Sequence, residues 1–289
     1  MTQKSTAILL MIAAIFFFAA MDATAKELSQ RVGTVQAIWA RYAGQAVMVF
    51  LIVLPRLKTV ARTRYPGLQF FRSVILMGAT GCFFFGISNI GLAEATAIMD
   101  VNPVLITLGA ALFLGEPLGP RRAMGIAVSL IGALIIIRPG SGVFSAYALF
   151  PLGAAICYSA YNLVTRYVGM KEDPWTSLLY TAAFGALILS CIVPFYWQPL
   201  DLAAFGLLIL LATFGTVSQL LLIKSLSLGE AGMLAPFAYV GLIFATLWGM
   251  LFFDEYPDVW TIVGALVIVA SGLYVWHREN AQDAQPQRS

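Results

Sequence analysis

Ten apolar runs, each long enough to cross a bilayer, constrain this sequence more than any other feature. A helix needs about 20 consecutive apolar residues to cross a hydrocarbon core of about 30 Å. Such runs, bounded by charged residues, glycine and proline, lie at 6–24, 34–54, 68–88, 94–114, 121–138, 147–167, 176–196, 203–223, 232–252 and 258–276. The sequence therefore predicts an all-α polytopic membrane protein with ten transmembrane helices embedded in a lipid bilayer.

The connectors between these runs leave little room for other chemistry. Ten spans consume most of the 289 residues, so no soluble catalytic or binding domain fits. The sequence contains no G-x-x-x-x-G-K loop, no G-x-S-x-G motif and no His/Cys cluster. We therefore expect no enzyme activity, no cofactor and no metal site. A net charge of +3 argues against nucleic acid as a partner.

Lysine and arginine residues are distributed unevenly between the two sets of connectors. If the N-terminus is cytoplasmic, thirteen of the seventeen lie in inside connectors, three lie outside, and Arg41 lies within a span. Basic residues are retained on the cytoplasmic side during insertion, so both termini are predicted to be cytoplasmic. An alternative is that the first run is a secretory signal cleaved after the Ala23-Thr24-Ala25 triplet. Cleavage would remove one helix, and the two halves of the chain would then no longer hold five spans each.

The two halves of the sequence resemble each other. Segment 112–117 reads LFLGEP and segment 251–256 reads LFFDEY, a shift of 139 residues. At the same shift Gly125 meets Gly264, and Gly132 meets Ser271. Each half holds five spans, and two copies of an odd-numbered unit must insert in opposite orientations. We therefore expect two inverted five-helix repeats, at 1–140 and 141–278, followed by a cytoplasmic tail at 279–289.

The sequence resembles the drug/metabolite transporter superfamily, in its EamA-like branch. The resemblance rests on the ten spans, the glutamate before the last span of each half, the WARY segment at 39–42 and the SGLY segment at 271–274. The resemblance covers residues 5–278. It implies a bacterial inner-membrane carrier of small organic metabolites, with a central cavity formed mainly by spans 1, 3, 4, 6, 8 and 9. Segment 230–255 is loosely similar to branch members that take up S-adenosylmethionine or riboflavin, and amino-acid exporters share the scaffold.

Charged side chains inside spans need a partner, a water-filled cavity or a function. Asp22 is placed either to pair with Lys26, four residues later, or to face the cavity. Arg41 lies about two turns inside the second span. We expect Arg41 to pair with Asp22 or Glu94, and direct contact with an anionic solute is the alternative.

Asp100 is the carboxylate predicted to lie deepest in the membrane. It precedes Asn102 and Pro103, and a proline in mid-span frees a backbone carbonyl one turn earlier. At the 139-residue shift Asp100 meets Tyr239, which follows Pro236. Both halves thus place a polar group beside a proline where inverted-repeat carriers bind their solutes. We expect Asp100 to face the cavity and to be the candidate for proton coupling; a buried ion pair with Arg41 or a hydrogen-bonded core carboxyl is the alternative.

Further polar residues in the sixth and eighth spans are candidates for solute binding, and polar contacts between helices are the alternative reading. These residues are Tyr158, Tyr161, Asn162, Ser218 and Gln219, which join Asp100, Asn102 and Tyr239 as the expected substrate-binding set.

Glu116 and Glu255 each end a span beside a turn. We expect them to cap the start of the next helix by accepting backbone N–H groups. The small residues that follow, around Gly125 and Gly264, allow close helix approach. The last spans of the two halves then pair either with each other or across a homodimer interface.

The predicted function is secondary transport of a small organic metabolite, such as a vitamin, S-adenosylmethionine or an amino acid, by alternating access. Two alternatives from other classes are an intramembrane enzyme or lipid-handling protein, which would need a catalytic constellation, and a passive channel. Channels normally show a lined pore and oligomeric symmetry rather than an internal inverted repeat.

Overall fold

A computed structural model describes residues 3–114, 120–138, 145–169, 172–228, 234 and 237–283. Helices and short turns make up these ranges, and no strand occurs within them. The α-helices are α1 Gln3–Val32, α2 Thr34–Val53, α3 Leu57–Val60, α4 Pro66–Ile87, α5 Leu92–Met99, α6 Asn102–Leu114, α7 Pro120–Ile137, α8 Leu149–Gly169, α9 Pro174–Ile192, α10 Leu202–Leu228, α12 Val240–Phe253 and α13 Val259–Asp283.

Six helical segments in the described ranges are long and apolar enough to cross a membrane, and shorter apolar helices accompany them. The prediction of an all-helical, multi-pass membrane protein is confirmed. The first helix is longer than the predicted 6–24 and continues to Val32, through Asp22 and Lys26. Its polar outer portion is buried against other helices, with Lys26 only 3% exposed, so the apolar pattern alone ended this helix too early.

Local sequence explains where several helices begin and end. Prolines open α4 and α9, where the missing N–H has no partner to lose, and Asp173 accepts the Trp175 N–H at 3.0 Å. Gly33 separates α1 from α2 with a φ of 83°, a conformation that favours glycine. A turn at Asp100 and Val101 separates α5 from α6, just before Pro103, so the apolar run at 94–114 is a broken helix.

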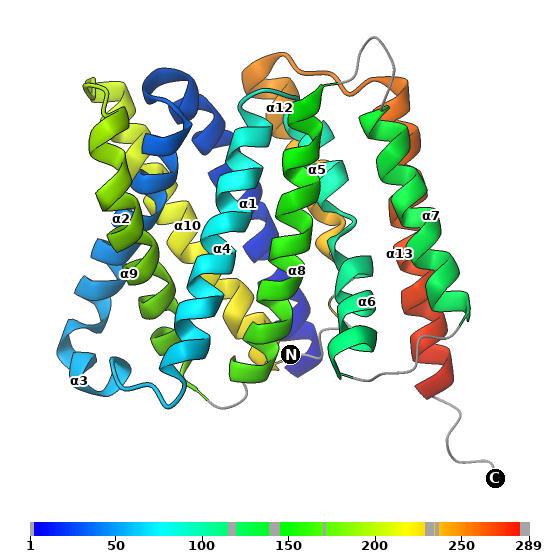
Figure 1. Ribbon diagram of the computed structural model, residues 1–289, viewed down its shortest axis with the longest axis horizontal. Helices are drawn as coiled ribbons and strands as arrows, with labels where there is room; N and C mark the ends of the chain where they lie inside the picture. Colours follow the sequence, from blue (N-terminus) through cyan, green and yellow to red (C-terminus); the bar gives the residue numbers. More distant parts are fainter. Residues whose placement is uncertain are drawn as a thin grey trace.

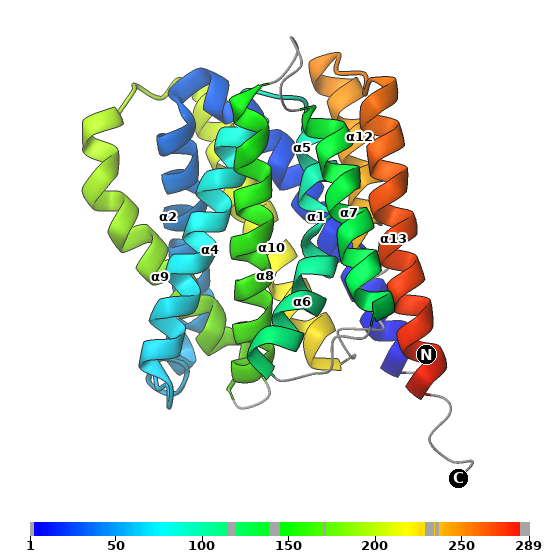
Figure 2. The same cartoon turned by 45° about the vertical axis from the view of Figure 1, so that its right-hand side comes forward.

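The helices stand side by side in one bundle (Figures 1 and 2). The start of α1, the end of α6, the start of α7 and the end of α13 lie at one end, whereas α12 turns into α13 at the opposite end. The most extensive contacts join α1 with α10, α7 with α13, α4 with α8, and α2 with α9. Large apolar side chains such as Leu51 and Leu187 are exposed, as expected where a helix faces lipid.

The contact between α7 and α13 depends on small residues. A Cβ added at Gly264 would lie 2.7 Å from the Gly132 carbonyl oxygen, and Ser271 donates a 3.0 Å hydrogen bond to the Gly125 carbonyl. Of the two arrangements that the sequence left open, the structure shows the last helices of the two halves packed against each other.

Candidate functional site

A buried group of polar and aromatic side chains, here called the central polar cluster, lies where α1, α2, α4, α8 and α10 meet. Its members are Asp22, Arg41, Tyr42, Thr80, Tyr158, Tyr161 and Gln219. Five of the residues expected from sequence, from both halves of the chain, are therefore brought together.

Arg41 is held firmly within this cluster. It is 3% exposed, donates a hydrogen bond to Thr80 Oγ1, and lies over the rings of Tyr42 and Phe84 at 5.1 and 5.9 Å. Its positive charge acts on the half-buried carboxylate of Asp22, although no ion pair within 4 Å joins them in the described part of the chain. Among the expected carboxylates, Asp22 is thus the one that Arg41 faces.

Two tyrosines on adjacent turns of α8 line the other side of the cluster. The rings of Tyr158 and Tyr161 stack with centroids 5.7 Å apart, and Gln219 donates a 2.7 Å hydrogen bond to the Tyr161 hydroxyl. Asn162 and Ser218 are less available, because their side chains bond to carbonyls of their own helices. The structure therefore brings Tyr158, Tyr161 and Gln219 together, with the Asn162 side chain beside Tyr158, whereas no contact of the Ser218 side chain with these three is seen among the described residues.

Asp100 lies apart from this cluster, at the break between α5 and α6. Its Oδ2 atom is buried without a hydrogen-bond partner, as is the hydroxyl of Tyr239, which lies close enough to interact electrostatically with the Asp100 carboxylate. Asp100 forms no ion pair within 4 Å in the described part of the chain, so the pairing with Arg41 that we considered is not seen there. Asn102, two residues later, accepts a 2.7 Å hydrogen bond from Ser159 and links α6 to α8. Pro236 lies outside the described residues.

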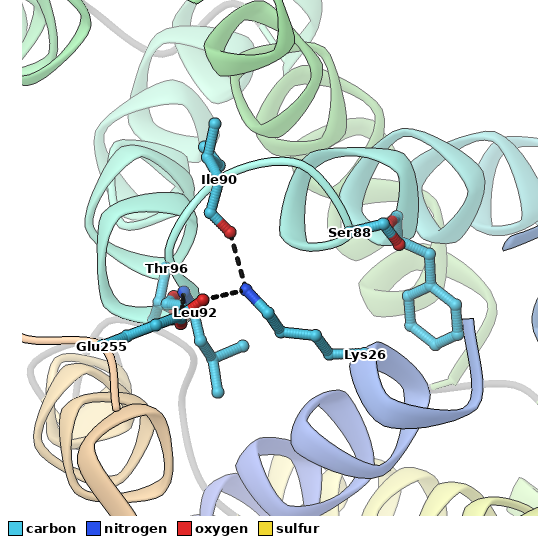
Figure 3. A network of polar contacts seen from close by, with 7 residues as sticks. Lys26, Ser88, Ile90, Leu92, Thr96 and Glu255 are labelled. Carbon is cyan, nitrogen blue, oxygen red and sulfur yellow. Dashed lines mark hydrogen bonds and ion pairs between the residues drawn. The ribbon is translucent and has the colours of Figure 1, made fainter. Parts of the chain in front are cut away.

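A second polar group, the Lys26–Glu255 network, ties the two halves together at one end of the bundle (Figure 3). Lys26 Nζ reaches from α1 to Glu255 Oε1 at 2.5 Å and to the Ile90 carbonyl at 2.8 Å. Glu255 Oε2 accepts the Leu92 N–H at 2.8 Å. Of the two roles considered for Asp22, pairing with Lys26 is not observed, since the ammonium group instead pairs with Glu255 from the other half.

Glu255 accepts an N–H group at a helix start, but that helix differs from the expected one. It is α5, in the other half of the chain, and not the following helix α13. The start of α13 is instead capped by Asp258, whose carboxylate accepts the Thr261 N–H at 2.8 Å. Glu94 lies beside this network, within electrostatic reach of Arg138 and Asp258 rather than of Arg41. Glu116 lies outside the described residues.

Sequence reasoning missed Arg72 and the group of polar residues at its end of α4. Arg72 is one of the thirteen basic residues assigned above to inside connectors, yet it is fully buried. The available signal is its position, four residues after the start of the predicted span at 68–88. Nearby, Glu172 Oε1 accepts hydrogen bonds from Thr63 Oγ1 and the Arg64 N–H, and Glu172 Oε2 accepts one from Gln69. Partial burial raises the pKa of Glu172, but these hydrogen bonds outweigh it, and the net effect lowers that pKa.

The chain is similar to known membrane transporters. The model of the EamA-like transporter family matches twice, at residues 5–138 and 145–276. The pseudopaline exporter of Pseudomonas aeruginosa is 28% identical, over 91% of this chain and 93% of its own length. The riboflavin transporter of Rhizobium johnstonii is 30% identical over 82% and 80%, and an S-adenosylmethionine uptake transporter of Rickettsia bellii is 25% identical over 90% and 89%.

A solved crystal structure matches the fold with a TM-score of 0.69, covering 97% of this chain and 99% of its own, at 17% identity. At that identity the likeness concerns the fold alone. The double family match spans nearly all of the described residues, including the central polar cluster and the Lys26–Glu255 network. This chain therefore belongs to the EamA-like transporter family.

Proposed function

We propose that this transporter is a secondary carrier that moves a small organic metabolite by alternating access between two inverted five-helix repeats. The observation that carries the proposal is the pattern of helix contacts. If α1, α4, α6 and α7 correspond to α8, α10, α12 and α13, the contact of α1 with α10 has its counterpart in that of α8 with α4, and the contact of α1 with α12 in that of α8 with α6. Both pairs occur, so the packing supports a two-fold relation.

Close contacts between α7 and α13 support the same relation. Under the 139-residue shift the contact of Gly132 with Gly264 exchanges with that of Ser271 with Gly125. Inverted repeats supply two similar end states, each open to one side of the membrane, which is the basis of alternating access.

Our first prediction is topological. In a protein whose three native cysteines are replaced by alanine, we expect Tyr256→Cys to react with a membrane-impermeant maleimide in intact cells and Leu118→Cys to react only after lysis. The reason is the excess of basic residues in the connectors predicted to be cytoplasmic, which include the one at 115–121. Equal labelling of the two positions in intact cells would contradict both the inverted repeat and the cytoplasmic termini.

We place the solute beside the central polar cluster and the break at Asp100, where the expected substrate-binding residues Tyr158, Tyr161 and Gln219 meet. Stacked tyrosine rings offer a flat apolar face, and the amide and guanidinium groups offer hydrogen bonds, a combination that suits polar organic molecules. The relatives' names, which specify pseudopaline, riboflavin and S-adenosylmethionine, support the same general class. We further propose the bacterial inner membrane as the location.

In this cycle the Lys26–Glu255 network closes the end of the bundle away from the termini. It joins α1, the α4–α5 turn and the α12–α13 turn through charged hydrogen bonds, which are stronger than neutral ones. An opening between α1 and α12 at this end must break these bonds.

Our second prediction tests this closure. Replacing Glu255 by Gln removes the charge from the network, so hydrogen exchange of the backbone around Leu92 should rise about tenfold in lipid nanodiscs. Glu27→Gln is the matched control, because Glu27 pairs with Arg31 on the same helix α1 but at an exposed position. Exchange that is equal in the two variants would show that the network does not hold this end closed.

A further inference from the structure

Arg72 is a buried cation whose hydrogen-bonding capacity is only partly used. Its side chain is fully buried, and Nη2 donates to the Ser177 carbonyl at 2.5 Å and to Thr181 Oγ1 at 2.7 Å. The other two nitrogens, Nε and Nη1, are buried with no partner. A buried charge without a full set of partners is strongly unfavourable, so this arrangement needs an explanation.

No carboxylate of the described residues compensates this charge. Asp22 faces Arg41, and the Glu172 carboxylate is occupied by Thr63, Gln69 and backbone. Arg72 forms no ion pair within 4 Å anywhere in the part of the chain that the structure describes. Among the described residues, Arg72 is therefore a buried positive charge with no carboxylate paired to it.

The position of Arg72 connects it to the proposed solute site. Its guanidinium lies over the Tyr161 ring, 5.4 Å from the centroid. The same ring also contacts Tyr158, which stacks on it, and Gln219, which donates to its hydroxyl. Along α4, Arg72 lies eight residues before Thr80, the partner of Arg41, which corresponds to about 12 Å of helix rise. Arg72 thus borders the central polar cluster on the side where α4 begins.

We infer that Arg72 binds a carboxylate group of the transported solute, so that the solute class is organic acids and amino-acid-like metabolites. This inference rests on the proposed carrier function. Guanidinium is the side-chain cation best suited to a carboxylate, because its planar array of donors matches the two oxygens. The unused Nε and Nη1 donors become paired when the carboxylate arrives, and the planar body of the solute lies against the tyrosine pair.

The test compares matched ligands in which a carboxylate is replaced by its uncharged amide. Purified protein in lipid nanodiscs is titrated with the pairs L-tyrosine and L-tyrosinamide, L-histidine and L-histidinamide, and benzoate and benzamide, and thermal stabilisation is measured. We expect the wild-type protein to bind at least one carboxylate at least about tenfold more tightly than its amide. Arg72→Gln should weaken carboxylate binding about ten- to hundredfold and leave amide binding unchanged, and Arg72→Lys should fall between. The control Arg31→Gln removes an equal charge from an exposed site and should change neither.

Three outcomes would overturn the inference. In the first, the wild-type protein binds no carboxylate of the panel or does not prefer it to the amide. In the second, the Arg72→Gln protein keeps the wild-type preference for the carboxylate. In the third, the Arg72→Gln protein loses binding of the carboxylate and of the amide equally. If Arg72→Gln does not fold, the preference measured with Arg72→Lys decides in the same way. Counterflow of a neutral solute in liposomes would leave the carrier function standing while the carboxylate inference fails, so the two are distinguishable.

Discussion

Replacing Asp100 by Asn is expected to abolish gradient-driven accumulation of solute while exchange of solute across the membrane continues. Asparagine keeps the shape of the side chain but cannot ionise. The carboxyl group lies at the break between α5 and α6 with Oδ2 unpaired, and none of the described cations forms an ion pair with it. Such a group is suited to carry a coupling proton, and a carrier without it still exchanges solute but loses the link to the proton gradient.

The measurement is uptake of labelled solute into proteoliposomes with and without a pH gradient. Asp201→Asn is the matched control, because Asp201 is an exposed carboxylate that accepts the Ala204 N–H, a role that asparagine can also fill. If charge complementarity to a cationic solute is the role of Asp100 instead, the variant loses binding itself. An Asp100→Asn protein with wild-type accumulation, affinity and pH dependence would return Asp100 to a structural role.

Replacing Arg41 by Ala is expected to destabilise the fold by about 1.5–3 kcal/mol, the range for loss of a hydrogen bond that involves a charged group. The change deletes the hydrogen bond to Thr80 and the contacts with the Tyr42 and Phe84 rings, and it leaves the Asp22 carboxylate without its facing charge. The loss of stability is measured by heating the purified protein and quantifying the folded fraction by size-exclusion chromatography. Arg31→Ala, at an exposed site, should change stability little.

Normal expression and thermal stability of Arg41→Ala, together with a large change in substrate preference, would show that Arg41 selects the solute. Because Arg72 is the cation assigned to the solute carboxylate, we expect different effects from replacing the two arginines. Loss of Arg41 lowers stability, and loss of Arg72 lowers carboxylate selectivity.

Hydrophobic length and proline position were enough to predict the all-helical membrane architecture, and the family resemblance that they supported is confirmed. They also predicted an irregularity near Pro103, where the structure separates α5 from α6. These features are predictable because they depend on local properties of the chain: the cost of exposing polar backbone to lipid and the missing N–H of proline.

The partners of individual charges were not predictable in the same way. Spacing along α1 suggested that Lys26 pairs with Asp22, but the ammonium reaches Glu255, 229 residues away. Arg72 was assigned to a connector because charges near span ends usually face water, whereas α9 packs over this part of α4 and buries it. Such choices depend on which helices pack together, which no local pattern specifies.

Counterflow in sealed liposomes tests the central claim most directly. Liposomes containing the purified protein are loaded with an unlabelled carboxylate identified by the binding panel, diluted into trace labelled solute, and followed over time. A carrier with alternating access should show transient accumulation of label above equilibrium and a rate that saturates with solute concentration. Label that only equilibrates, at a rate proportional to concentration, would indicate a passive channel, and conversion of the solute to another compound would indicate an intramembrane enzyme; either result would contradict the carrier mechanism.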